Sequence, residues 1–202
     1  MAVVSVVDAD GVEAGVRELG VPPGGVVMVH SSLSALGSVE GGAEAVVRGV
    51  LGVAGTVVVP AFTPQASVAA VGARAAEVTS RQPLGYAVGR GSPFEWLSRA
   101  GARIVLLGVG HDRNSFLHYA ESLVPHHRRK VRRFPYLVDG ERVWVRTDDV
   151  GDDNGRFFPQ VGAEFGETGG VRRGKIGDAD CQVMDCVPFV GFARRRLAEL
   201  LR

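Results

Sequence analysis

Val26-Val-Met-Val-His30 and Thr56-Val-Val-Val-Pro60 are two short apolar runs that decide the fold of this chain. Each is the length of a buried strand. Between them, apolar residues recur at helical spacing within residues 40–51, at Ala43, Val46, Val47, Val50 and Leu51. Strand, helix and strand in this order predict a β-α-β unit, which requires a parallel pairing and a right-handed crossover.

Further helices and strands are indicated on both sides of this unit. Asp10 followed by Glu13 is typical of a capping box and predicts a helix in which Asp10 is the N-cap. Ser92-Pro93-Phe-Glu95 predicts a second helix start, with serine as N-cap and proline in the first turn. Arg103–Leu107 is predicted as a third buried strand, and Val187–Arg202 as an amphipathic closing helix.

The later part of the chain contains a different pattern. Tyr136–Val145 is predicted to form an antiparallel hairpin around an Asp139-Gly140 turn. The segment Ala66–Thr79 is rich in alanine and valine, and its second half is predicted to be helical. The fold class is therefore α/β, with a central, mostly parallel sheet flanked by helices and a late antiparallel hairpin.

Length and composition point to one globular domain over residues 1–202. The chain has 46% hydrophobic and 22% charged residues and a formal net charge of +1, so neither nucleic acid nor a membrane surface is an expected partner. Cys181 and Cys186 provide neither a disulfide framework nor a zinc pattern. The first residues lack the features of a signal peptide and no apolar run reaches the length of a membrane span, so a cytoplasmic location is expected.

Two charged runs invite functional interpretations. The basic run over residues 126–133 has the charge of a nucleic-acid patch or of a site for cofactor phosphates, and the acidic run over residues 148–153 suits a polycationic substrate. No aromatic residues alternate with the basic residues, and the two runs offset one another. A solvated loop is therefore predicted for the first run and solvated surface for the second.

His118 and Glu121 are the strongest candidate for catalysis. Spaced i, i+3, they share one face of a helix, where a carboxylate beside a neutral imidazole creates a general base. The alternative is an exposed helix whose two side chains merely face solvent. A second pair, His111-Asp112, follows the third strand, and His30 ends the first, so both histidines are placed at the carboxyl edge of the sheet, where ligands bind. No spacing favours a zinc site.

Several of these segments together resemble the aminoglycoside 3-N-acetyltransferase family. The resemblance covers nearly the whole chain in order and is strongest at its last two segments. It is carried by Val29–Ser34, Gly41–Ala43, Val57–Thr63, Pro64–Gly72, Gly91–Pro93, Leu107–Asn114 and Leu117–Glu121.

The resemblance implies transfer of an acetyl group from acetyl-CoA to an amine of an aminoglycoside-type antibiotic, and hence antibiotic resistance. It implies direct transfer without an acyl-enzyme and without a metal. His118 is then the expected general base. Glu121 is expected to orient it or to contact the cationic groups of the substrate. Asp112 is a second candidate for polarising the imidazole or for binding an ammonium group. Coenzyme A is expected to lie along two segments, His30-Ser31-Ser32-Leu33 and Ser67-Val68.

One departure from the family pattern falls between Thr63 and Pro64. Family members carry several dozen additional residues at this point, and those residues help to build the antibiotic side of the cleft. A chain without them is expected to keep the coenzyme A half of the site, while its acceptor half is in question. The resemblance therefore leaves open a coenzyme A-binding protein of the same fold without a competent acceptor site. The identity of the amine and the oligomeric state are not predicted.

Overall fold

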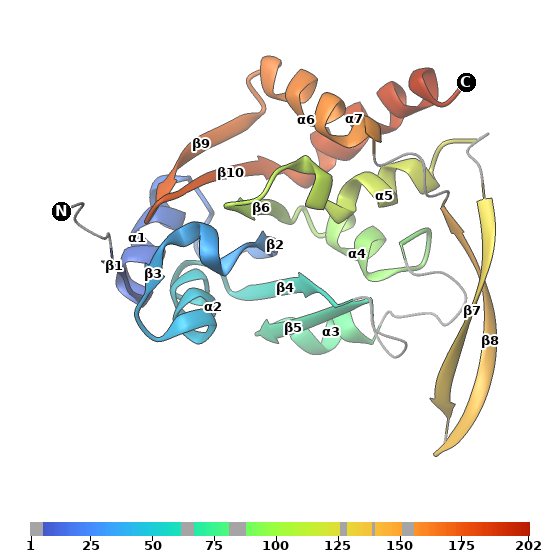
Figure 1. The fold of residues 1–202 in the computed structure, drawn as a ribbon, viewed down its shortest axis with the longest axis horizontal. Coiled ribbons are helices and arrows are strands. Elements are labelled where there is room, and N and C mark those ends of the chain that lie inside the picture. The colour runs from blue at the N-terminus through green and yellow to red at the C-terminus, as the bar shows by residue number, and fades with distance from the viewer. Residues whose placement is uncertain (1–5, 62–66, 81–87, 126–128, 139, 151–155) are drawn as a thin grey trace.

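The computed structural model describes residues 6–61, 67–80, 88–125, 129–138, 140–150 and 156–202. Its centre is a six-stranded sheet (Figure 1). In spatial order the strands are β5 (Val68–Gly72), β4 (Thr56–Pro60), β2 (Val26–Ser31), β6 (Arg103–Leu107), β10 (Ala179–Asp185) and β9 (Val171–Ile176).

The middle of the sheet is parallel, as the β-α-β pattern predicts. Strand β2 pairs in parallel with β4 on one side and with β6 on the other. The outer strands run antiparallel, because β5 returns along β4 while β10 and β9 form a hairpin beside β6. The α/β fold class and the three central strands are confirmed, whereas β5, β9 and β10 are additions that the sequence patterns did not indicate.

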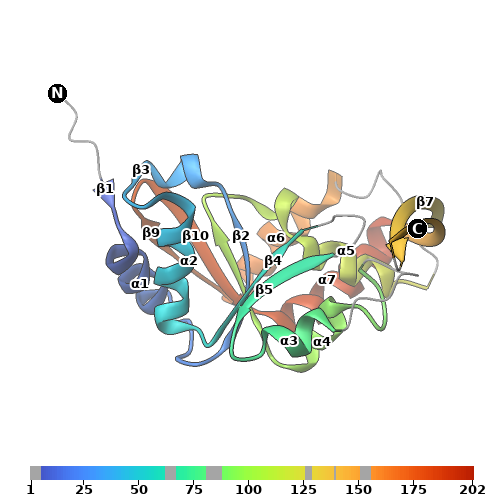
Figure 2. The ribbon, with the colours of Figure 1, turned by 90° about the horizontal axis from the view of Figure 1, so that it is seen from below.

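Helices cover both faces of the sheet and give it three layers. One face carries α1 (Ala9–Glu18) and α2 (Gly42–Val53), and Figure 2 shows the other helices on the opposite side. The other helices are α3 (Ala75–Thr79), α4 (Pro93–Arg99), α5 (Ser115–Ser122), α6 (Phe158–Glu167) and α7 (Cys186–Leu200).

Each face has its own hydrophobic core, because successive side chains of a strand point to opposite faces. Met28 and Ile104 belong to the core beneath α4 to α7, whereas Val27 and Val105 belong to the core beneath α1 and α2. All four side chains are fully buried. The continuous apolar runs in the sequence therefore reflect central strands that are covered on both sides.

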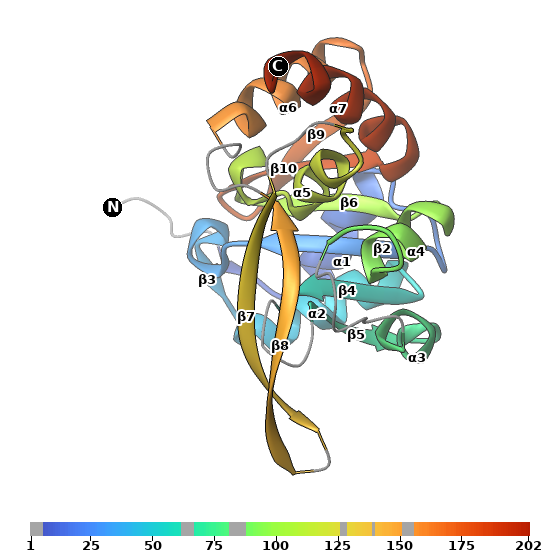
Figure 3. The same ribbon diagram turned by 90° about the vertical axis from the view of Figure 1, so that its right-hand side faces the viewer.

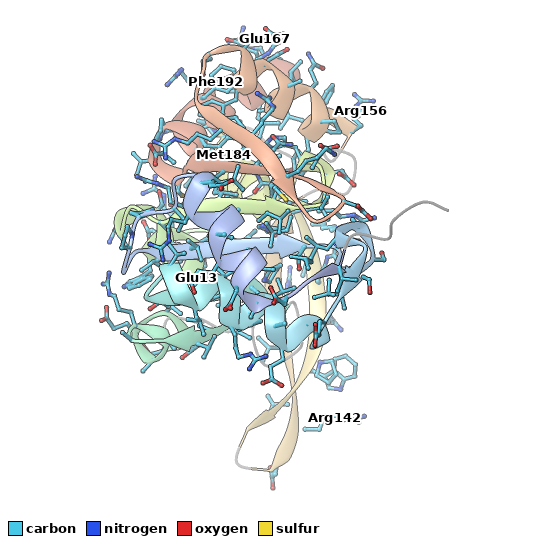
Figure 4. All side chains as sticks on the ribbon, turned by 90° about the vertical axis from the view of Figure 1, so that its left-hand side faces the viewer. Glu13, Arg142, Arg156, Glu167, Met184 and Phe192 are labelled. Carbon is cyan, nitrogen blue, oxygen red and sulfur yellow. The ribbon has the colours of Figure 1, made fainter. Side chains whose placement is uncertain are left out.

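The predicted hairpin is present and is longer than expected. Strands β7 (Arg129–Val138) and β8 (Glu141–Val150) form a separate twisted ribbon that extends beyond the rest of the molecule (Figure 3). Figure 4 shows Arg142 near its tip. The basic run was predicted as a loop, and this was wrong for residues 129–133, which belong to β7. The register explains why, since it places Lys130 opposite Asp149 and Val131 opposite Asp148, so the two charged runs pair as strands. Residues 126–128 and 151–153 of these runs lie outside the described ranges.

Two helix starts can be compared with their predictions. The N-cap of α1 is Asp8 rather than Asp10, because the carboxylate of Asp8 accepts a hydrogen bond of 2.9 Å from the N–H of Gly11. Asp10 lies in the first turn instead. At α4, Ser92 is the N-cap as predicted, and the Glu95 carboxylate accepts a 2.7 Å hydrogen bond from the N–H of Gly91. The composition at a helix start thus located the helix to within about two residues.

Cys181 and Cys186 are both buried and free. Within the described ranges, no helix has the length and apolarity needed to cross a membrane.

Candidate active site

A cleft of about 860 Å³ lies at the carboxyl ends of the three parallel strands. This edge of an open α/β sheet is where ligands usually bind, and the cleft has the volume of a small-molecule site. The end of β2 and the segment that follows β6 contribute most of its wall. The lining residues are Val29–Ser32, Val59, Pro60, Gly108–Gly110, Asp112–Ser115 and His118.

His118 and Glu121 form a pair on α5 at the edge of this cleft. The imidazole Nδ1 lies 3.2 Å from Oε2 of Glu121. The Glu121 side chain is fully buried, whereas the His118 side chain is 39% exposed. The ring of Phe158 meets the imidazole edge to face at a centroid distance of 4.7 Å and fixes its plane. An Nδ1–H that donates to the carboxylate leaves Nε2 with a free lone pair, which is the state a general base requires. The alternative of a solvent-facing pair is excluded for Glu121 by its burial.

The N-terminus of α5 is held by side chains from two directions. Asn114 is its N-cap and accepts a 3.1 Å hydrogen bond at Oδ1 from the N–H of Phe116. The N–H of Ser115 donates to Nε2 of His30 on β2, at 3.0 Å. Two of the N–H groups that a helix start leaves unpaired are thus satisfied inside the protein.

His30 is one of the residues that line the cleft, although only 4% of its surface is exposed. Desolvation, and secondarily the neighbouring His111, lowers the pKa of His30 to about 4. The ring is therefore neutral near pH 7. Because Nε2 accepts a hydrogen bond, the proton of the neutral ring resides on Nδ1.

His111 belongs to the packing of the loop after β6. Its ring stacks on Phe189 at a centroid distance of 5.5 Å, and its Nδ1 lies 3.3 Å from the amide nitrogen of Asn114. Burial is the main cause that lowers its pKa. Gly162 leaves room for the ring, because a Cβ at that position would lie 2.1 Å from the imidazole. These contacts place His111 in the core that supports the cleft, since the cleft lining does not include it.

Asp112 and Arg113 face the cleft from the same loop. The carboxylate of Asp112 lies 3.2 Å from Nε of Arg113, and the two side chains are 54% and 73% exposed. Asp112 is therefore available to a cationic group of a substrate. Arg113 was not predicted as a site residue, although its place directly after His111-Asp112 in the sequence was a signal for it.

The segments expected along coenzyme A are only partly brought together. Ser31 and Ser32 line the cleft, and the N–H of Ser32 donates to the carbonyl oxygen of Leu107 at 2.9 Å. Leu33 is 42% exposed and does not line the cleft. Ser67 and Val68 lie beside the cleft, next to the end of β4. The carbonyl oxygen of Ser67 accepts a 2.9 Å hydrogen bond from the N–H of Ala61, and buried Val68 pairs with Pro60.

The turn from Gly108 to Gly110 forms one wall of the cleft and was noticed in the sequence only as a turn. Gly108 has φ +65°, a conformation that side chains other than glycine rarely adopt. A Cβ there would also lie 2.4 Å from Cβ of Ala35. Glycine at position 108 therefore lets this turn pack directly against Ala35. Its signal in the sequence was the Gly-Val-Gly pattern directly after a buried strand.

Acid is expected to destabilise the protein through His30. The unfolded chain takes up a proton near the ordinary pKa of 6.5, but the folded chain does so only near pH 4. Stability is therefore lost as the pH falls through this window, by about 3 kcal/mol in total. Urea unfolding at pH 7, 5.5 and 4 should show this loss in the wild type and a shallower one in His30→Gln. Equal pH dependence in the two proteins would contradict the account.

Among the residues described, no three or more His, Cys, Asp and Glu side chains form a group that could hold a metal ion.

The chain matches the model of the protein family described as aminoglycoside 3-N-acetyltransferase. The match falls on two segments, residues 28–65 and 62–198, which meet where Thr63 is followed by Pro64.

Individual relatives agree with this match. An aminoglycoside N(3)-acetyltransferase III of Pseudomonas aeruginosa is 36% identical over 135 residues, which cover 64% of this chain and 50% of that protein. The enzyme of the same name from Serratia marcescens is 29% identical over 254 residues, covering 91% and 94%. The crystal structure of the aminoglycoside acetyltransferase AAC(3)-Xa superposes with a TM-score of 0.87 at 27% identity, over 98% of this chain and 94% of that one.

Proposed function

The chain belongs to the aminoglycoside 3-N-acetyltransferase family, and on that premise we propose that it transfers the acetyl group of acetyl-CoA to an amino group of an aminoglycoside-type antibiotic. Acetyl-CoA is the co-substrate of this family. The observation that carries the proposal is the pair of His118 and Glu121 at the edge of the cleft. Because acetyl-CoA is an intracellular metabolite, the reaction would take place in the cytoplasm.

His118 is proposed as the general base. An amine reaches the cleft mainly as an ammonium ion and must first lose a proton to solvent before its lone pair can attack a carbonyl carbon. Nε2 of His118 accepts the second proton that the nitrogen releases as the new C–N bond forms, and the thiolate of coenzyme A leaves. The buried Glu121 carboxylate, 3.2 Å from Nδ1, stabilises the imidazolium that results. The transfer then needs no covalent acyl-enzyme.

The walls of the cleft suit an acyl donor. Ser31 and Ser32 offer hydroxyl groups beside the flat Gly108–Gly110 turn, and Arg113 offers a cation for phosphate. The thioester supplies the activated acyl carbon when coenzyme A is bound. Asp112 is proposed to hold an ammonium group of the acceptor on the same side as His118.

A second candidate function follows from the direct join of Thr63 to Pro64, where the family pattern has additional residues. The match to the Serratia marcescens relative runs over 254 residues although this chain has only 202, so that relative carries residues without a counterpart here. The two matched segments of the family model overlap at residues 62–65, around the same position. A coenzyme A-binding protein without a competent acceptor site is therefore the rival proposal.

A thiol-release assay separates these proposals. The protein is incubated with acetyl-CoA and a panel of aminoglycosides and simpler amines, and free coenzyme A is measured. Release that depends on an amine supports acetyl transfer. Binding of coenzyme A without release for any amine supports the rival, and release without an acceptor would indicate thioester hydrolysis. Intact-mass measurement near 21.3 kDa establishes that the tested chain carries no additional segment.

A further inference from the structure

His30 connects the central strand of the sheet to the helix that carries the proposed base. Its Nε2 accepts the hydrogen bond of the Ser115 amide, 85 residues further along the chain. Ser115 is the first residue of α5, and His118 follows three residues later, within the first turn. The imidazole of His30 is thus the acceptor that fixes the start of α5 against the end of β2.

We propose that His30 is a positioning residue for acetyl transfer, which holds α5 so that His118 faces the cleft. This inference rests on the proposed function and assigns His30 a role other than the contact to coenzyme A that the family resemblance implies. His30 is one of the residues that line the cleft, but a residue that is only 4% exposed has little surface to offer a ligand, and this supports the assignment.

Burying the imidazole of His30 costs free energy, while the ring accepts a hydrogen bond from only one amide. This cost also favours a specific role for His30. Nδ1 of His30 is buried and has no hydrogen-bond partner among the residues that the structure describes. An unpaired buried donor opposes folding, so the Ser115 contact must compensate for it. Helix α5 has only eight residues, and small displacements of a catalytic group reduce rates strongly, by up to about 10²-fold for 1 Å.

Two substitutions test whether the hydrogen-bond acceptor at residue 30 must lie at the position of Nε2, or whether any acceptor on that side chain is sufficient. In His30→Gln the side-chain oxygen reaches about as far as Nε2 and can accept from Ser115. In His30→Asn the oxygen takes the place of Nδ1 and falls short. We expect His30→Asn and His30→Ala to lower kcat by about 10- to 10²-fold with the KM for acetyl-CoA changed less than about 3-fold, and His30→Gln to restore kcat.

A third variant controls for the loss of a buried polar group as such. Ser92 is 1% exposed and its hydroxyl has no partner among the described residues, so Ser92→Ala should leave kcat unchanged. The inference is overturned if His30→Ala raises the KM for acetyl-CoA at constant kcat, or if His30→Asn is as active as His30→Gln. Thermal melting of each variant shows whether it folds.

Amide hydrogen exchange of Ser115 tests the same contact without reference to activity. Protection of this amide should fall at least about 10-fold in His30→Asn and be retained in His30→Gln. Equal protection in all variants would refute the positioning role. If the wild type transfers acetyl groups to no amine, the proposed function fails, while the exchange measurement still decides whether His30 holds α5.

Discussion

His118→Ala is expected to lower kcat for acetyl transfer by about 10²- to 10⁴-fold, the contribution typical of a general base. Without Nε2 the attacking amine loses the proposed acceptor of its proton. Coenzyme A should bind as in the wild type, because His118 sits on α5 while the hydroxyl groups of Ser31 and Ser32 come from β2 and the turn that follows it. The measurements are steady-state kinetics with a fixed aminoglycoside and calorimetric titration with coenzyme A.

The two readouts together decide the role of His118. Loss of kcat with unchanged coenzyme A affinity identifies a group that acts on the acceptor. Normal turnover by His118→Ala would remove His118 from the mechanism. A matching loss of affinity for coenzyme A would instead make it part of the binding site for the co-substrate.

Glu121→Gln is expected to have the next largest effect, a fall in kcat of at least about 10²-fold. The glutamine amide occupies nearly the same space as the carboxylate, but it carries no charge to stabilise the imidazolium of His118. The fully buried position makes this loss large, because surrounding water cannot replace the missing charge.

Glu95→Gln is the matched control for this variant. Glu95 lies in the first turn of α4 and its side chain is only 18% exposed. Its carboxylate contacts Gly91, just before α4, and Arg99 at the end of α4, and it does not line the cleft. Its kcat should equal that of the wild type. If Glu121→Gln retains full activity, or if both variants lose activity equally, the buried pair is not the source of basicity.

Much of this site was predictable because it depends on local patterns. The apolar runs at residues 26–30, 56–60 and 103–107 became the three parallel strands, and strand ends placed His30 and the Gly108–Gly110 turn at one edge. The i, i+3 spacing of His118 and Glu121 was sufficient to predict their contact, since helix geometry alone brings such residues together.

Contacts between distant segments were not predictable from one sequence. Nothing near His30 indicates that its acceptor atom meets Ser115, and nothing near His118 indicates the ring of Phe158. The outer strands were missed for a different reason. Strand β9 reads Val-Arg-Arg-Gly-Lys-Ile, and its charged residues are typical of an exposed edge that avoids further pairing rather than of a buried strand.

Despite the direct join of Thr63 to Pro64, this chain is proposed to transfer an acetyl group to an aminoglycoside amine. Mass spectrometry of an aminoglycoside after incubation with isotopically labelled acetyl-CoA and the purified protein tests it most directly. The account predicts a mono-N-acetylated product that carries the label, formed by the wild type and nearly absent with His118→Ala. Coenzyme A binding without any labelled product across a panel of aminoglycosides would contradict it.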